Sequence, residues 1–307
     1  MISSREKLPV ALIVYNRPHL TKPVLKKIFD YRPPKLFVIA DGPKNNKDKK
    51  LCNEVRDLID TFNWECSIEK IYSNNNMGLK ERVISGLNEV FKKSVSAIIL
   101  EDDCLPSDDF FIFCNEMINR YQNEERVGLV TGVNFQDGIL RGNGSYYFSK
   151  YNHCWGWATW SRSWDYFSES IDFWPEYKRS PDWKRNFNSF RERQFWTKHF
   201  DYTFKNNSNS WAANWTLSVW YKKVLTVTPQ YNLVSNIGFG NDSTHTNDSN
   251  SKYANMDIEK LGKIKFLENI ECNIDADIYT FENHFQGYKL RLRNRIFRIL
   301  NKIIKRQ

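Results

Sequence analysis

The densest group of residues that could do chemistry lies between positions 97 and 111, in the stretch AIILEDDCLPSDDFF. A short apolar run ends there in three consecutive acids, Glu101, Asp102 and Asp103. Clustered carboxylates suit a hard divalent cation such as Mg²⁺ or Mn²⁺, which commonly shares its coordination with a substrate's phosphates. The alternative is solvent-exposed charge after a strand. The position of the acids in the fold therefore decides between a cation site and surface charge.

The first 135 residues alternate between strand-like and helix-like patterns. Apolar runs typical of strands occupy 9–16, 35–42, 66–73, 96–100 and 127–133. Helical spacing of apolar residues marks 20–29, 76–93 and 107–121, and the charged segment 44–60 can hold a further helix. This alternation predicts an α/β fold with a mostly parallel sheet and helices on both faces. Ligands bind at the carboxyl ends of such strands, where the acidic triplet lies.

Other predicted strands also end in polar residues. Tyr15, Asn16 and Arg17 follow the first strand, and Asp41 follows the second. Arg17 could bind a phosphate as a bidentate donor, and Asp41 could accept a hydrogen bond from a base or a ribose. The chain contains neither GxxxxGK[ST] nor GxGxxG, so no P-loop or dinucleotide site is indicated. A metal-bound diphosphate without those loops favours nucleotide-sugar chemistry.

The composition changes from about residue 145. Ten of the eleven tryptophans lie between Trp155 and Trp220, and we expect most of them in the core, although they could stack on sugar rings. Cys104, beside the triplet, is expected to be a small buried hydrophobic residue. The segment 228–253 is rich in Asn, Ser, Gly and Thr, which predicts a long loop.

The formal charge of +9 is concentrated at the end of the chain. Eight Lys and Arg and no acid follow Glu282, and without those eight the charge falls to +1. A nearly neutral body argues against nucleic acid as a partner. On a helix, five apolar residues of this tail share one face: Leu292, Ile296, Ile299, Leu300 and Ile303. The pattern predicts a helix lying on an anionic membrane surface, with a terminal helix docked on the domain as the alternative.

The cysteines and the N-terminus indicate the compartment. Six cysteines are scattered without a CxxC pair, as is typical of reduced thiols in a cytosolic protein. The apolar runs are far shorter than the roughly 20 residues that cross a bilayer. The start loosely resembles a signal peptide, but Asn16, Arg17 and Pro18 stand where a cleavage site should be. We therefore expect a cytoplasmic protein, peripheral at the inner face of the cell membrane.

Six motifs occur in a familiar order: VYNRP, ADGPK, NMGLKERVISGL, AIILEDDCLPSDDFF, HCWGWATW and SNIGFGNDSTHT. In this order the chain resembles the GT-A glycosyltransferases, and within them the bacterial cell-surface polysaccharide transferases related to animal N-acetylglucosaminyltransferase I. The resemblance runs from about residue 8 to 250. It implies a Rossmann-like GT-A domain over 1–284, with a nucleotide-sugar-binding half (1–135), a Trp-rich acceptor half with a lid loop (136–250), and a basic amphipathic tail (285–307).

The resemblance also implies roles for individual residues. Asp103 would ligate the Mn²⁺ or Mg²⁺ ion, and Glu101 and Asp102 would bind the donor's sugar and ribose. The first loop, Tyr15 to Arg17, would contact the donor nucleotide, and Asp41 would hydrogen-bond the uracil. The stretch 236–246 would close over the donor as a lid. Within it His245 would be a second metal ligand, with a solvated loop histidine as the alternative.

The general base is missing from its usual place. In the animal relative an Asp within Trp-Asp-Asp-Trp serves, whereas the similar stretch here is SWAANW, with Ala212 and Ala213 in place of the acids. The base is then expected elsewhere, at Asp242 or Asp201, with Asp165 as a further candidate. An inactive, degenerate transferase is the other interpretation.

Together these features predict a metal-dependent hexosyl- or N-acetylhexosaminyltransferase of polysaccharide biosynthesis. It would move a sugar from a nucleoside-diphosphate donor, a UDP-sugar such as UDP-GlcNAc, to a cell-surface glycan or lipid-linked oligosaccharide, with inversion. One alternative is a sugar-nucleotidyl transferase, which usually carries a phosphate loop near its first strand that this chain lacks. Another is a non-catalytic carbohydrate-binding protein, which would have no need of the acidic triplet.

Overall fold

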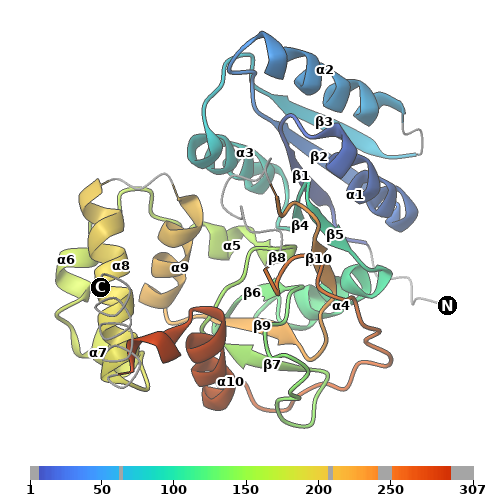
Figure 1. Cartoon of the computed structure of the whole chain (residues 1–307). Helices are drawn as coiled ribbons and strands as arrows, with labels where there is room; N and C mark the ends of the chain where they lie inside the picture. Colours follow the sequence, from blue (N-terminus) through green and yellow to red (C-terminus); the bar gives the residue numbers. More distant parts are fainter. Residues whose placement is uncertain (1–6, 62–64, 207–209, 241–250, 292–307) are drawn as a thin grey trace, which may run out of the picture.

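The computed structural model describes residues 7–61, 65–206, 210–240 and 251–291 (Figure 1). Its centre is an eight-stranded mixed sheet in the order β3-β2-β1-β4-β8-β6-β9-β7. The strands are β1 (Val10–Val14), β2 (Lys35–Ala40), β3 (Ser67–Tyr72), β4 (Ser96–Glu101), β6 (Val127–Thr131), β7 (Tyr146–Ser149), β8 (Trp157–Trp160) and β9 (Leu225–Pro229). A second, two-stranded sheet pairs β5 (Cys104–Pro106) with β10 (Val234–Asn236).

Helices cover both faces of the large sheet. The long ones are α1 (Pro18–Tyr31), α2 (Asn46–Thr61), α3 (Leu79–Lys93), α4 (Asp108–Arg120), α8 (Phe190–Asn206) and α9 (Trp211–Tyr221). The short ones are α5 (Ser161–Trp164), α6 (Trp174–Tyr177), α7 (Pro181–Arg185), α10 (Ile274–Tyr279), the π-helix η1 (Thr280–His284) and the 3-10 helix η2 (Gly287–Leu290).

The alternation of side chains along β1 explains the two layers of helices. Val10, Leu12 and Val14 belong to one apolar cluster, together with residues of α1, α2 and α4. Ala11 and Ile13 belong to a second cluster, with residues of α3 and α5–α9. Because successive strand residues point to opposite faces, a strand that is apolar throughout must be covered on both sides. The predicted α/β fold class, with helices flanking the sheet, is confirmed.

Every strand and helix predicted in the first 135 residues is present. The strands β3, β2, β1 and β4 pair in parallel, as expected. The far half of the sheet is mixed, because β8 lies between β4 and β6 and is antiparallel to both. The sequence did not predict this insertion, since β8 comes after β6 in the chain.

The tryptophan-rich region forms core, as predicted for most of its tryptophans. Trp157 and Trp215 are completely buried, and Trp174 is as well. They pack with the rest of the second apolar cluster beneath α8 and α9. Trp155 is only partly buried and contacts Phe239 edge to face at a centroid separation of 5.7 Å. Cys104 is fully buried, as expected, and none of the six cysteines, all of them among the described residues, forms a disulfide.

The prediction of a continuous loop over 228–253 is wrong at its start. The chain completes β9 there and then forms β10, whose residues pair antiparallel with β5, Asn236 opposite Cys104. Its polar composition concealed two apolar residues, Leu233 and Val234, which are fully buried. The pairing brings the chain that follows β10 beside the acidic triplet, where the Ile237 amide donates to the Asp103 carbonyl at 2.9 Å.

The segment from α10 to η2 packs back onto the body. The buried Asp277 carboxylate accepts hydrogen bonds from the Ser149 hydroxyl and the Lys150 amide. Glu282 forms ion pairs with Arg191 at 2.7 Å and Arg291 at 3.0 Å. Residues 285–291 were assigned to the tail, but Arg291 among them pairs with Glu282 of the predicted domain. The apolar tail positions from 292 onward lie outside the described residues. Among the described helices, none is long and apolar enough to cross a membrane.

Candidate functional site

The acidic triplet lies at the carboxyl edge of the sheet, as predicted. Parallel pairing places Ile13 of β1 beside Glu101 of β4, so the loops after both strands meet. There Arg17 pairs with Asp102 through two of its nitrogens, and its Nη1 lies 3.0 Å from Asp103 Oδ2. The structure therefore brings together the three acids and the predicted phosphate-binding arginine.

The site is short of positive charge, because three carboxylates face one guanidinium. Burial raises the pKa of Glu101 to about 8, and the charges of Asp103 and Asp102 push it in the same direction. Burial also raises the pKa of Asp102, although the Arg17 guanidinium opposes that rise. A cation bound nearby would offset this penalty and favour the ionised forms of Glu101 and Asp102.

This carboxylate set fits a divalent ion that is completed by a ligand. Among the described residues no three His, Cys, Asp or Glu side chains converge as a closed metal site. Mg²⁺ is usually held by one or two carboxylates and by substrate phosphates, so a closed cage is not required. The Asp103 side chain keeps 12% of its surface exposed, against 4% for Asp102, which makes Asp103 the more accessible ligand.

Gly238 lies against the Asp103 carboxylate. A Cβ atom at this position would lie 2.2 Å from Asp103 Oδ2, which is closer than any real contact of this kind. Only glycine allows the chain after β10 to pass so close to the carboxylate. The beginning of the predicted lid, 236–240, is therefore adjacent to the triplet, while the rest of the lid lies outside the described residues.

The other predicted donor-binding residues are engaged in hydrogen bonds around α2. The Tyr15 hydroxyl and the Asn16 amide both donate to the Asp48 carboxylate, at 3.0 and 2.9 Å. The Lys44 amide donates to the Tyr15 hydroxyl at 3.3 Å. These contacts fix the first loop against the start of α2.

Asp41 is buried, with 6% of its surface exposed, and it organises the turn before α3. Its Oδ1 accepts from the amides of Gly42 and Met77, and its Oδ2 accepts from the Gly78 amide and the Asn76 side chain, at 2.8 to 3.0 Å. A carboxylate has about four acceptor positions. The turn therefore occupies the acceptor positions of Asp41, with which the resemblance would have it hydrogen-bond the uracil. The contact with a base stays a prediction.

The candidate general bases do not lie together in the structure. Asp201 on α8 accepts from the Trp174 indole at 3.0 Å and forms an ion pair with Lys178 at 2.8 Å. Asp165 is exposed at the end of α5. Neither lines the cavity described below. Asp242 and the predicted metal ligand His245 lie outside the described residues.

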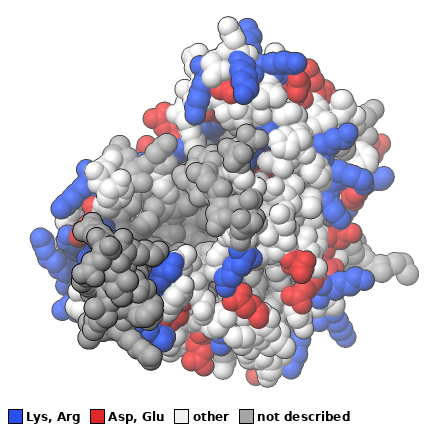
Figure 2. All heavy atoms as spheres, viewed as in Figure 1, with Lys and Arg blue, Asp and Glu red and all other residues white. Residues whose placement is uncertain are grey.

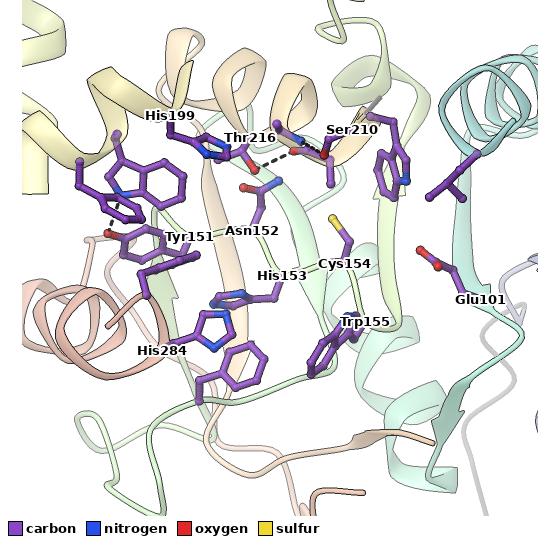
Figure 3. Close-up of a pocket in the computed structure, with 18 residues that line it drawn as sticks. Glu101, Tyr151, Asn152, His153, Cys154, Trp155, His199, Ser210, Thr216 and His284 are labelled. Atoms are coloured by element: carbon purple, nitrogen blue, oxygen red, sulfur yellow. Dashed lines mark hydrogen bonds between the residues drawn. The ribbon is translucent and has the colours of Figure 1, made fainter. Parts of the chain in front are cut away.

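A cavity of about 380 Å³ opens beside the triplet, within the roughly 300–1,000 Å³ range of small-molecule sites. Figure 3 shows Glu101 at one end, Tyr151 and His199 toward the other, and Asn152, His153 and His284 between them. Ala212 and Ala213, which replace the relatives' acids, line the same cavity from the first turn of α9.

Sequence reasoning missed the polar residues of this cavity. Asn152 and His153 lie in the stretch YNHCWGW, where polar residues among aromatic ones were the available signal. His284 comes from η1, more than thirty residues beyond the end of the family resemblance. No local pattern connects it with the site, because only the packing of the C-terminal segment brings it there.

Comparisons with known proteins give no family assignment. No protein-family model matches the chain, and no curated protein matches it. Solved structures with similarity include the mannosyltransferase PcManGT from Pyrobaculum calidifontis in complex with GDP-Man and Mn²⁺, 15% identical over 71% of each chain, with a TM-score of 0.42. A UTP-bound UGPase from Acinetobacter baumannii is 9% identical over 76% of this chain and 88% of that one, with a TM-score of 0.38. Because both TM-scores lie below 0.5, neither similarity carries an argument about function.

Proposed function

We propose that the chain is a GT-A-type glycosyltransferase that uses a nucleoside-diphosphate sugar and a divalent cation. The observation that carries the proposal is the acidic triplet at the carboxyl edge of the sheet, with Glu101 lining a cavity and Asp103 more accessible than Asp102. The order of sequence motifs supports the same activity. A UDP-sugar is the proposed donor and a cell-surface glycan, lipid-linked during synthesis, the proposed acceptor.

The charge of each residue indicates its proposed role. Asp103 would hold the Mn²⁺ or Mg²⁺ ion, whose chemistry is to neutralise the departing diphosphate. Arg17, which now pairs with Asp102 and Asp103, has the donors to bind phosphate oxygens when a nucleotide enters. Glu101 faces the cavity and would hydrogen-bond a hydroxyl of the transferred sugar.

In the proposed transfer the bond from the sugar's C1 to the diphosphate oxygen breaks, and the acceptor oxygen bonds to C1. The acceptor's hydroxyl proton passes to a general base, which in an inverting reaction is typically worth about 10²–10⁴-fold. Of the candidates we retain Asp242, because Asp201 is paired with Lys178 outside the cavity. Asp242→Asn should lose acceptor-dependent turnover and keep its affinity for UDP, and normal turnover would exclude Asp242.

We also propose a peripheral location at the inner face of the cell membrane. Figure 2 shows Lys and Arg on the rim of one face, with a group at the left beside α6–α8. Residues 174–223 hold ten Lys and Arg against four Asp and Glu. This stretch and the eight cations after Glu282 are the two cation-rich parts of the sequence. Anionic lipid would attract both.

Thermal unfolding with a panel of nucleotides tests the activity class. UDP, GDP, UTP and UDP-sugars are each added with and without Mn²⁺ to the full chain. The proposal expects stabilisation by a diphosphate or its sugar that requires the ion, and its loss in Asp103→Ala. Asp108→Ala is the matched control, because Asp108 is an exposed acid on α4. Pyrophosphate release from UTP and a sugar phosphate would identify a nucleotidyl transferase and overturn the proposal.

A further inference from the structure

We propose that the part of the cavity away from Glu101 binds one uncharged pyranose ring, which is the terminal sugar of the acceptor. The polar atoms of Asn152 and His284 would hydrogen-bond the ring's hydroxyls, and aromatic side chains would pack against its faces. The assignment to the acceptor rests on the proposed function, whereas the sugar-ring site stands on the cavity itself.

Polar atoms in the cavity wall have no hydrogen-bond partners among the described residues. Both side-chain atoms of Asn152, Nδ2 and Oδ1, are buried without a hydrogen bond to any described residue, and so is Nδ1 of His284. Leaving such groups unsatisfied is unfavourable, so each needs a ligand or a water molecule. A sugar hydroxyl both donates and accepts, which matches the donor and acceptor of an amide and of a neutral imidazole.

The wall of the cavity is rich in aromatic side chains. The His284 ring stacks on Phe135 with a centroid separation of 3.9 Å and an interplanar angle of 16°. Phe285 and Tyr151 extend this aromatic surface, with ring centroids 5.1 Å apart. A mostly aromatic wall that carries a few polar groups is the usual construction of a small-molecule site, and it suits a ring with apolar faces and hydroxylated edges.

The charge of the cavity wall selects among sugars. Of the 18 described residues that line the cavity, none is Lys or Arg, and Glu101 is the one acid among them. Burial lowers the pKa of His284 to about 4 and that of His153 well below its usual value, so both rings are neutral near pH 7. The carboxylate of an acidic sugar such as a uronate would lose its hydration in this cavity and would find no cationic side chain among the described lining residues. The cavity therefore favours an uncharged sugar.

The C-terminal segment completes the site. His284 is held in the wall because the Gln136 amide donates to the Thr280 hydroxyl at 2.9 Å and the Ala276 carbonyl at 3.2 Å. These bonds fix α10 and η1 against the loop that carries Phe135. The segment lies beyond the family resemblance, so the residue that it contributes would distinguish this chain's acceptor from those of related transferases.

Binding of simple glycosides to the full chain tests the site directly. The probes are the methyl glycosides of glucose, galactose, mannose and N-acetylglucosamine, and methyl glucuronide as the acidic counterpart, observed by saturation-transfer NMR. At least one neutral glycoside should bind and the glucuronide should not. Asn152→Ala and His284→Phe should each weaken binding by about threefold to tenfold, as the loss of one hydrogen bond does.

Matched variants separate the site from general damage. Asn186 also has a buried, unpartnered Nδ2 but lies outside this cavity, so Asn186→Ala should bind normally. His19 is exposed on α1, so His19→Phe should also bind normally. Ala212→Phe should fill the cavity from α9 and abolish binding even if an Asn152 variant fails to fold. Absence of binding by every neutral glycoside, equal binding by all variants, or equal binding of the glucuronide would overturn the inference.

The same samples distinguish this inference from the proposed function. Binding of UDP with Mn²⁺ is measured in parallel, and it should not change in Asn152→Ala or His284→Phe. Glycoside binding should persist in saturating UDP-GlcNAc and Mn²⁺, whereas displacement would assign the ring to the donor and overturn the acceptor assignment. Normal UDP binding without glycoside binding would refute the inference alone. Glycoside binding without nucleotide binding would refute the transferase and keep the sugar site.

Discussion

At the scale of single residues, the site depends on an imbalance between three acids and one arginine. The residue types and their position were predictable, because polar residues that end neighbouring strands of a parallel sheet must meet at one edge. The pairing of Arg17 with both Asp102 and Asp103 was not predictable, since it depends on side-chain geometry at the end of β1. The Asn76–Gly78 turn that Asp41 holds is likewise visible only in the structure.

Arg17→Met should destabilise the protein and make it respond to metal. The substitution leaves two largely buried carboxylates without their cation, which costs about 3–5 kcal/mol when a buried pair is broken. In urea unfolding we expect a lower midpoint, and Mn²⁺ alone should restore more stability to the variant than to the wild type. Lys27→Met, which breaks the exposed pair with Asp108, is the control and should change little. Equal effects of the two substitutions would refute the account of the triplet.

Gly238→Ala should displace the Asp103 carboxylate, because the added Cβ would lie 2.2 Å from its Oδ2. We expect Mn²⁺-dependent UDP affinity to fall by at least about tenfold, as when a key ligand shifts its position. Gly142→Ala is the control: it adds strain at φ +79°, but its Cβ meets nothing within 4 Å. Calorimetric titration would contradict the prediction if Gly238→Ala bound UDP normally.

At the scale of elements, apolar patterns located eight strands and helices of the first 135 residues because their buried faces are regular, and the charged segment 44–60 located α2. The three-residue strand β5 was not predicted. Periodicity could not show that β8 enters the sheet between β4 and β6, because sheet order depends on long-range packing. It also missed β10, a three-residue strand within a polar stretch. The cavity is formed by elements far apart in sequence, so sequence reasoning found Glu101 in its wall but not Asn152, His153 or His284.

The η1 element should make stability depend on pH through His284. Its pKa falls from 6.5 to about 4 on folding, because burial disfavours the imidazolium. Between pH 6.5 and about pH 4, His284 is therefore mostly protonated in the unfolded chain and mostly neutral in the folded chain. Acid then favours unfolding. Between pH 7 and pH 5 the wild type should lose on the order of 2 kcal/mol relative to His284→Phe. Urea titrations at both pH values measure this difference, and parallel pH dependence of the two proteins would contradict it.

At the scale of the whole molecule, composition indicated an uneven charge that the fold places partly on α6–α8. The nearly neutral remainder and the concentrated cations were both readable from the sequence. What composition could not show is that residues up to Arg291 are tied to the body, through the pair of Arg291 with Glu282. Residues 285–291 therefore belong with the body, and a separate basic tail stays a prediction for residues 292–307.

Truncation after Arg291 should release the protein from anionic vesicles and leave its fold intact. The cut removes six of the eight terminal cations and all five apolar positions of the predicted amphipathic face. We expect sedimentation with phosphatidylserine vesicles to be lost at physiological salt, with an unchanged unfolding midpoint. A truncated protein that still sediments, or a full-length protein that ignores anionic lipid, would refute the membrane proposal.

The central claim is that Asp103 holds the ion through which this chain uses a nucleotide sugar. The most direct measurement is turnover of UDP-sugars by the full chain, compared between wild type and Asp103→Ala in the presence and absence of Mn²⁺. We predict that wild-type turnover requires the ion, and that the variant loses about 10²-fold or more, as expected when a key electrostatic group is removed. Unchanged, ion-dependent turnover by Asp103→Ala would contradict the claim.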